Sequence, residues 1–145
     1  LFAAGLAGER FAVRNSGAVS VIEGCDSNGC EYMTGGTVVI LGKVGDNFAA
    51  GMTGGMAFIY DLSNNFENRV NPETVIWQKP ETKYWIDYLK NLIEEHYKET
   101  NSNISKGIID NFEKEIYNFI QVCPKEMINK LDNPITNKIN VKEVS

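Results

Sequence analysis

The N-terminal part of the chain contains a repeated pattern in which a glycine precedes a short apolar run. Three copies lie 19 residues apart, at residues 17–23, 36–42 and 55–61. Each run is rich in β-branched residues, and such runs between glycines are typical of β-strands. The pattern therefore predicts three equivalent short strands.

The spacing of the copies predicts how these strands are connected. A repeat of 19 residues is too short for a strand–helix–strand unit, which takes about 30 residues or more. It fits one coil of a parallel β-solenoid, in which each coil stacks on the next. We therefore predict a mainly β fold, a parallel β-helix, over residues 1–61. The two inward-facing ladders of this prediction join Val21, Ile40 and Ile59, and Val19, Val38 and Ala57.

The alternate positions of the predicted strands are also mostly apolar. They include Val39, Phe58 and Leu41. Strands that are buried on both faces read as continuous hydrophobic runs. We therefore expect the outer face of the sheet to be covered, by the C-terminal helices or by another domain.

Glycines at the predicted coil corners are interpreted as structural, because glycine allows positive φ and close approach of two backbones. The five glycines assigned this role are Gly17, Gly35, Gly36, Gly54 and Gly55. A phosphate-binding loop is a poor alternative. Gly42-Lys43 is followed by Val44 rather than Ser or Thr, and the dinucleotide-binding pattern G-x-G-x-x-G does not occur.

The second half of the chain has apolar residues at helical spacing. Residues 62–82 contain turn residues and are expected to be a linker, and residues 83–131 are expected to be C-terminal helices. One helix is predicted before a stop at residues 100–103, a second from Ile104 to Ile120, and a short third from Pro124. Residues 132–145 are expected to be a tail.

Composition excludes several classes of partner. The net charge is −5, without a basic patch, so neither nucleic acid nor a membrane surface is an expected partner. No apolar run approaches the roughly 18–20 residues that span a bilayer. The sequence begins without Met and reads as the continuation of an earlier segment, so the β-helix is expected to be truncated at its N-terminus.

The sequence contains few residues that could catalyse a reaction or bind a metal. Cys25, Cys30 and Cys123 are too few and too irregularly spaced for a disulfide framework or a zinc site, and they fit a reducing compartment. His96 lies among glutamates on a predicted helix and is expected at a surface or interface. Arg10 and Arg14 lie beside the glycine-rich coils and are expected to have a structural role, pairing across coils or across a domain interface. We predict no catalytic, cofactor-binding or metal-binding residue in this chain.

Three long sequence motifs resemble the large chain of glutamate synthase. These motifs are GERFAVRNSGA at residues 8–18, GCEYMTGG at residues 29–36 and NFAAGMTGG at residues 47–55. The resemblance extends from Leu1 to about Leu131. It identifies the chain as similar to the C-terminal glycine-repeat domain, also called GXGXG, of that family. The family's fold in this region implies that the β-helix is right-handed.

The resemblance also implies a function. Glutamate synthase is an oxidoreductase that makes two glutamates from glutamine and 2-oxoglutarate with a reductant, and it serves ammonia assimilation. The implied FMN and iron–sulfur cluster belong to upstream domains, as does the family's cysteine nucleophile. The implied partners are the upstream synthase and amidotransferase domains, and a small FAD- and NAD(P)H-dependent subunit is a further candidate. A cytoplasmic location is expected, or a plastid if the source is a photosynthetic eukaryote.

Two other functions stay open at this stage. The chain could be a stand-alone β-helix interaction subunit of another oxidoreductase assembly, of the kind found in formylmethanofuran dehydrogenase. It could also be a small independent enzyme, although the sequence offers no nucleophile–base pair. The long sequence motifs favour a structural, non-catalytic domain that organises glutamate synthase.

Overall fold

The computed structural model describes residues 1–12 and 14–136. Val13, in the motif at residues 8–18, and most of the predicted tail lie outside the described residues. Five strands form one sheet in the order β1-β2-β3-β5-β4. The strands are β1 (Ser16–Ile22), β2 (Thr34–Ile40), β3 (Gly54–Tyr60), β4 (Val75–Gln78) and β5 (Phe119–Pro124). The helices are α1 (Lys83–Thr100), α2 (Asn103–Asp110) and α3 (Phe112–Glu115), with 3₁₀ turns η1 (Phe66–Asn68), η2 (Ile116–Asn118) and η3 (Lys125–Met127).

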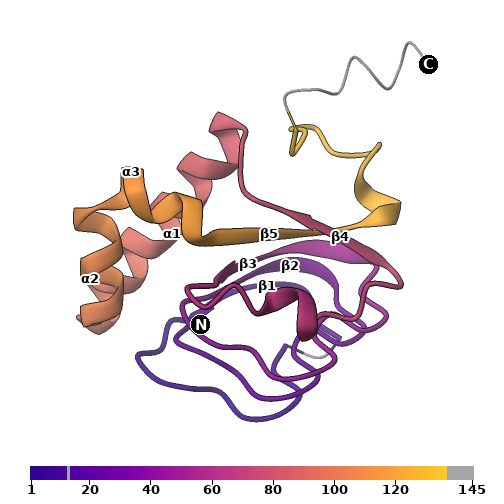
Figure 1. Ribbon diagram of the computed structural model, residues 1–145, viewed down its shortest axis with the longest axis horizontal. Helices are drawn as coiled ribbons and strands as arrows, with labels where there is room; N and C mark the ends of the chain where they lie inside the picture. The colour runs from indigo at the N-terminus through magenta and orange to yellow at the C-terminus, as the bar shows by residue number, and fades with distance from the viewer. Residues whose placement is uncertain (13, 137–145) are drawn as a thin grey trace.

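The predicted right-handed parallel β-helix is wrong as a description of this fold. The strands β1, β2 and β3 pair in parallel, but β3 pairs with β5 and β5 with β4 in antiparallel fashion. Among the described residues the result is an open, mixed sheet accompanied by three helices (Figure 1). The glycine repeat ends with its third copy. Beyond it, an antiparallel strand from the C-terminal half occupies the edge of β3.

Both predicted ladders are also wrong by one residue at β1, where Val19 pairs with Thr37 instead of Val38. Between β2 and β3, Val38 pairs with Ala57 and Ile40 with Ile59, as the repeat predicts. Between β1 and β2 the register shifts after Ser16, so that Val21 pairs with Val39 instead of Ile40. Because side chains alternate between the faces of a strand, this slip exchanges the two faces of β1.

The turns between the parallel strands lie in layers below the sheet (Figure 1). Every second residue in them has a positive φ near +60°, in three equivalent sets: Arg10, Ala12 and Arg14; Asn28, Cys30 and Tyr32; Asn47, Ala49 and Gly51. In the middle layer, Asn28 N–H donates to Asp46 O, whereas Cys30 N–H donates to Phe11 O in the opposite layer. The alternating backbone therefore hydrogen-bonds to both neighbouring layers.

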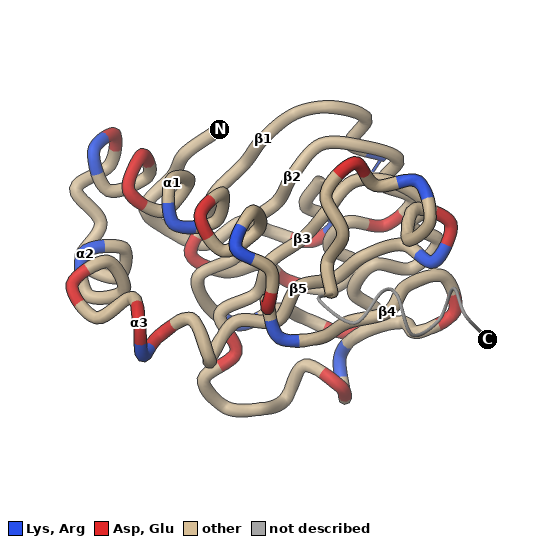
Figure 2. The backbone as a smooth tube through the Cα atoms, turned by 90° about the horizontal axis from the view of Figure 1, so that it is seen from above, with Lys and Arg blue, Asp and Glu red and all other residues tan. Residues whose placement is uncertain are grey.

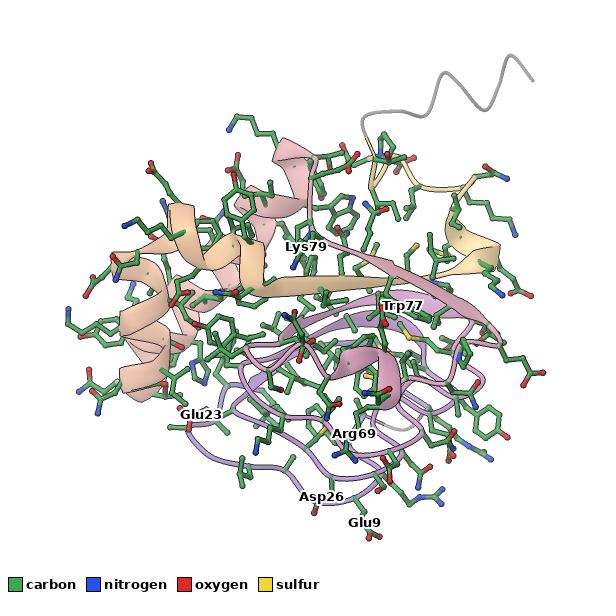
Figure 3. All side chains as sticks on the ribbon, in the orientation of Figure 1. Glu9, Glu23, Asp26, Arg69, Trp77 and Lys79 are labelled. Atoms are coloured by element: carbon green, nitrogen blue, oxygen red, sulfur yellow. The ribbon has the colours of Figure 1, made fainter. Side chains whose placement is uncertain are left out.

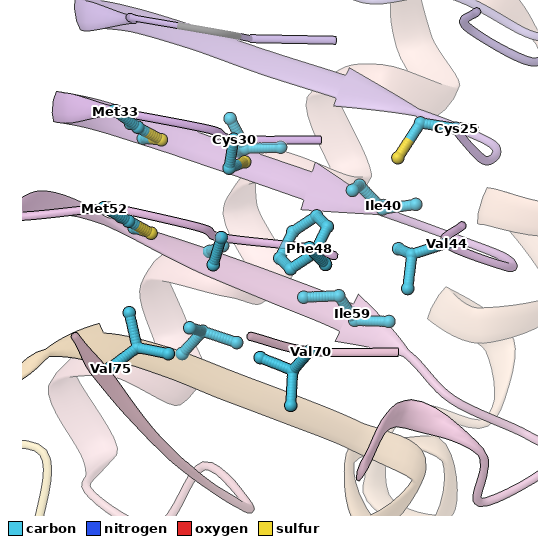
Figure 4. Packing of buried hydrophobic residues seen from close by; sticks show 14 of the residues in the cluster. Cys25, Cys30, Met33, Ile40, Val44, Phe48, Met52, Ile59, Val70 and Val75 are labelled. Atoms are coloured by element: carbon cyan, nitrogen blue, oxygen red, sulfur yellow. The ribbon is translucent and has the colours of Figure 1, made fainter. Parts of the chain in front are cut away.

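Two apolar clusters stabilise the sheet, one on each face. The inner cluster joins Ile22, Ile40 and Ile59 to turn residues such as Phe48, and Met33 lies above Met52 within it (Figure 4). The outer cluster packs sheet residues against the C-terminal helices; its members include Val39, Phe58, Leu89, Ile93 and Ile108. The prediction that helices cover the outer face is confirmed.

The C-terminal half differs in part from its prediction. Helix α1 ends at Asn101, whose left-handed conformation caps it, and Ser102 caps α2 by accepting from Ser105 N–H, as the predicted stop required. The predicted second helix is interrupted after Asp110 and continues as α3 and η2, but its end is wrong, because residues 119–124 form β5. The third helix is wrong too, since only the short η3 follows Pro124. Strand β4 lies within the expected linker.

Candidate functional site

The three cysteines are buried free thiols. Burial raises the pKa of Cys25 to about 11, and also that of Cys123 to about 11. Burial raises the pKa of Cys30 further still. A thiol acts as a nucleophile or metal ligand only as a thiolate. The neutral, enclosed thiols of this chain therefore serve as small apolar side chains.

His96 is fully buried, so of the two expected places the surface is wrong; the residue lies where α1 meets α2 and the N-terminal segment. Its Nδ1 lies 2.6 Å from Ser105 Oγ, and its Nε2 lies 2.7 Å from the Ala3 carbonyl oxygen. A carbonyl can only accept, so Nε2 carries a proton and donates to Ala3. Both ring nitrogens are thus occupied by contacts within the protein, and neither is directed at a substrate.

The His96 contacts belong to a longer chain of polar groups. Ser105 N–H donates to Ser102 Oγ at 3.3 Å, and Ser102 Oγ donates to Glu23 Oε2 at 2.5 Å. The chain joins the N-terminal segment and the residue after β1 to the helices α1 and α2. Glu23 lies on the helix side of the turns (Figure 3). This network fixes the helices against the sheet.

The predicted structural glycines differ in their surroundings. A Cβ added at Gly54 would collide with the carbonyl of Thr34, and one at Gly35 would lie 2.6 Å from Ser16 O. Gly36 and Gly55 have φ values of +85° and +84°, which side chains rarely adopt. A Cβ at Gly17 would meet nothing within 4 Å.

A ladder of asparagines crosses the turn layers and was missed by the sequence analysis. Asn47 Nδ2 donates to Asn28 Oδ1 at 3.0 Å, and Asn71 Nδ2 donates to Asn47 Oδ1 at 2.9 Å. The spacing of Asn28 and Asn47 matches the 19-residue repeat and could have revealed it. Asn71 lies 24 residues beyond Asn47, outside the repeat. The expected structural role of Arg10 is supported by its ion pair with Glu31 at 3.8 Å.

One pocket lies at the carboxyl ends of β2 and β3 and has a volume of about 530 Å³. Its apolar lining comes from Leu41, Val44, Ile59, Leu62, Phe66 and Ile104, and its charged lining from Lys43, Asp61 and Arg69. The Asp61 carboxylate accepts from the backbone N–H groups of Asn65 and Phe66 at 3.2 and 3.1 Å. We call this the strand-end pocket.

Other site types find little support in the part of the chain that the structure describes. Within it, no group of three or more His, Cys, Asp or Glu side chains could hold a metal ion. None of its helices combines the length and apolar character needed to cross a bilayer. Charged residues are scattered over the described layers and helices and do not gather on one element (Figure 2).

Comparison with known proteins gives consistent matches. The chain is 60% identical over 135 residues to the glutamate synthase [NADPH] large chain of Azospirillum brasilense, and 43% identical over 143 residues to the glutamate synthase [NADH] of Schizosaccharomyces pombe. It is 50% identical over 129 residues to the ferredoxin-dependent glutamate synthase of Pyropia yezoensis. These matches cover 93%, 99% and 89% of the chain but only 9%, 7% and 8% of the three relatives.

The chain thus spans less than a tenth of the length of these relatives. The profile of the family described as GXGXG motif matches residues 1–125, which is most of the sequence. The chain therefore belongs to the GXGXG motif family.

Proposed function

We propose that this chain is the C-terminal segment of a glutamate synthase large chain and that its own role is structural. The observation that carries this proposal is the 60% identity to the Azospirillum brasilense large chain over 93% of the sequence. The buried thiols and the enclosed His96 support a role outside the chemistry, because neither presents a free reactive group.

The whole enzyme would convert glutamine and 2-oxoglutarate into two glutamates with a reductant. FMN and an iron–sulfur cluster would supply the redox chemistry in other parts of the polypeptide. The thiols of Cys25, Cys30 and Cys123 do not fit a cluster, since they are buried and protonated and no metal-binding group forms among the described residues. No step of the reaction is therefore assigned to this segment.

The names of the relatives support a role that does not depend on the electron donor. They specify NADPH, NADH and ferredoxin in turn, yet each matches at least 89% of this chain. A segment that handled the donor would be expected to differ among them. We therefore propose that it positions the synthase and amidotransferase domains; a small FAD- and NAD(P)H-dependent subunit is a further candidate partner.

In the proposed enzyme, Gly35, Gly36, Gly54 and Gly55 have a structural role at the beginnings of β2 and β3, whereas Gly17 in β1 has space for a side chain. We further propose a cytoplasmic location, or a plastid in a photosynthetic eukaryote, where two relatives are named chloroplastic.

The test is to purify the natural polypeptide that contains this chain and to measure its cofactors and activity. We expect bound FMN, iron and acid-labile sulfide, and formation of glutamate from glutamine and 2-oxoglutarate with a reductant. A natural polypeptide that has no FMN-binding synthase domain upstream of Leu1 would refute the proposal.

A further inference from the structure

The strand-end pocket is lined by buried apolar side chains and by Lys43, a cation without an ion-pair partner among the described residues. Leu41, Ile59 and Phe66 form buried walls, whereas Leu62 and Ile104 at its margin are 64% and 40% exposed. Exposed apolar side chains beside a concave surface mark contact sites for other polypeptides. The pocket is thus suited to receive an apolar side chain.

The charges around the pocket differ in how they are satisfied. Arg69 Nη1 pairs with Asp46 at 2.6 Å, and both oxygens of Asp61 accept backbone N–H groups. Figure 3 places Arg69 among the turns below the sheet. Lys43 is exposed and has no ion-pair partner among the described residues. It is therefore the lining cation that remains free to bind an incoming carboxylate.

We infer that the strand-end pocket docks a segment from another part of the same polypeptide, which inserts an apolar side chain and pairs an adjacent carboxylate with Lys43. The inference rests on the proposed function. It is supported by the length of chain available, because more than nine tenths of the Azospirillum brasilense relative lies outside the matched region. An intrachain segment also needs no separate association step, which favours it over a free peptide.

The experiment uses the natural full-length polypeptide with Ser63→Cys, an exposed position in the pocket lining. Maleimide labelling at residue 63 is followed by mass spectrometry, alone and together with Lys43→Glu. A docked segment should slow labelling about tenfold relative to Glu94→Cys, an exposed α1 position that does not line the pocket, if about nine tenths of the molecules hold it docked. Lys43→Glu should remove most of that protection, whereas the matched change Lys98→Glu on α1 should leave it intact.

A photo-crosslinker at residue 63 identifies the occupant. The inference expects a crosslink within the same polypeptide, next to an Asp or Glu. A crosslink to a different polypeptide, or labelling of Ser63→Cys as fast as Glu94→Cys, would overturn it. If the same preparation contains FMN and forms glutamate, that negative result rejects the docking site alone. If it has neither property, the proposed function fails first.

Discussion

Alternating backbone conformation is the residue-scale feature that allows the turns to stack. Arg10, Ala12, Cys30 and Ala49 adopt positive φ although none is glycine. Residues other than Gly and Asn rarely adopt a positive φ, since this conformation brings Cβ close to the backbone. Here the cost is offset by backbone hydrogen bonds to both neighbouring layers, such as Cys30 N–H to Phe11 O in the preceding layer and Asn28 N–H to Asp46 O in the following layer.

Replacing Gly36 with Val should destabilise the protein by about 2–4 kcal/mol. Its φ is +85°, and an added Cβ would collide with the Ala18 carbonyl. The control is Gly107→Ala on α2, where an added Cβ meets nothing and stability should rise by up to about 1 kcal/mol. Urea unfolding measures both. Equal stability of Gly36→Val and the unchanged protein would contradict the assignment of Gly36.

Stability should fall as the pH rises from about 9 to about 11. Burial raises the pKa of Cys25 from 9.0 to about 11 in the folded protein. As the pH rises, the thiol therefore ionises in the unfolded chain before it ionises in the folded protein. Its contribution to the free energy of unfolding is complete below pH 9 and is lost as the pH rises to the folded pKa. The loss is roughly 2 kcal/mol for this thiol. Denaturant unfolding at a series of pH values measures it, and Cys25→Ala should show a shallower decline.

At the scale of elements, the glycine spacing predicts the strands of the repeat well, but the sequence predicts poorly which strands and residues pair. The repeat places β2 and β3 correctly, because Thr37 to Ile40 pair with residues 19 positions further on. It misses the slip at β1, where Val19 to Ile22 pair with residues only 18 positions further on although the glycines of the copies are 19 apart. It also reads residues 119–124 as helix. That segment becomes β5 because it fills the space between β3 and β4, a long-range contact that local periodicity cannot reveal.

The candidate site shows the same division. The Ser102 cap follows from local residue types. Cys25 and Cys30 are buried although glycine and acidic residues flank both of them in the sequence, so local sequence does not reveal their burial. The position of His96 could not be predicted, because its partner Ala3 lies 93 residues away. The strand-end pocket likewise combines residues from after β2, after β3 and from α2.

The asparagine ladder should stabilise the contact between layers by about 1–2 kcal/mol. Asn47→Ala removes hydrogen bonds to Asn28 and Asn71 and also places alanine at a φ of +58°. Asn64→Ala is the matched control, since Asn64 has a φ of +54° and lies outside the ladder. Thermal or urea unfolding should show a greater loss for Asn47→Ala. Equal losses would mean that the ladder contributes nothing beyond backbone conformation.

At the scale of the whole molecule, this segment is a sheet covered on both faces. The turns enclose one face and the helices the other. The network from Ala3 through His96 and Ser105 to Glu23 locks the two halves together. Such an arrangement supports the proposed role of positioning other domains, and it keeps the thiols and His96 inside.

The polar network should contribute to stability and not to turnover. Ser105→Ala leaves His96 Nδ1 buried without its partner, which should cost about 1–3 kcal/mol. Hydrogen exchange of α1 and α2 should accelerate accordingly. A Ser105→Ala protein with unchanged exchange in both helices would contradict this role.

The most direct test of the account is glutamate formation by the natural full-length polypeptide in which Cys25, Cys30, Cys123 and His96 are replaced one at a time, the cysteines by Ala and His96 by Gln. Activity is expressed per mole of folded, FMN-containing enzyme. We predict kcat and KM values within about twofold of the unchanged enzyme, because catalysis by a positioned side chain is typically worth about 100-fold or more. A loss of that size in a folded, fully loaded variant would contradict a structural role for this segment.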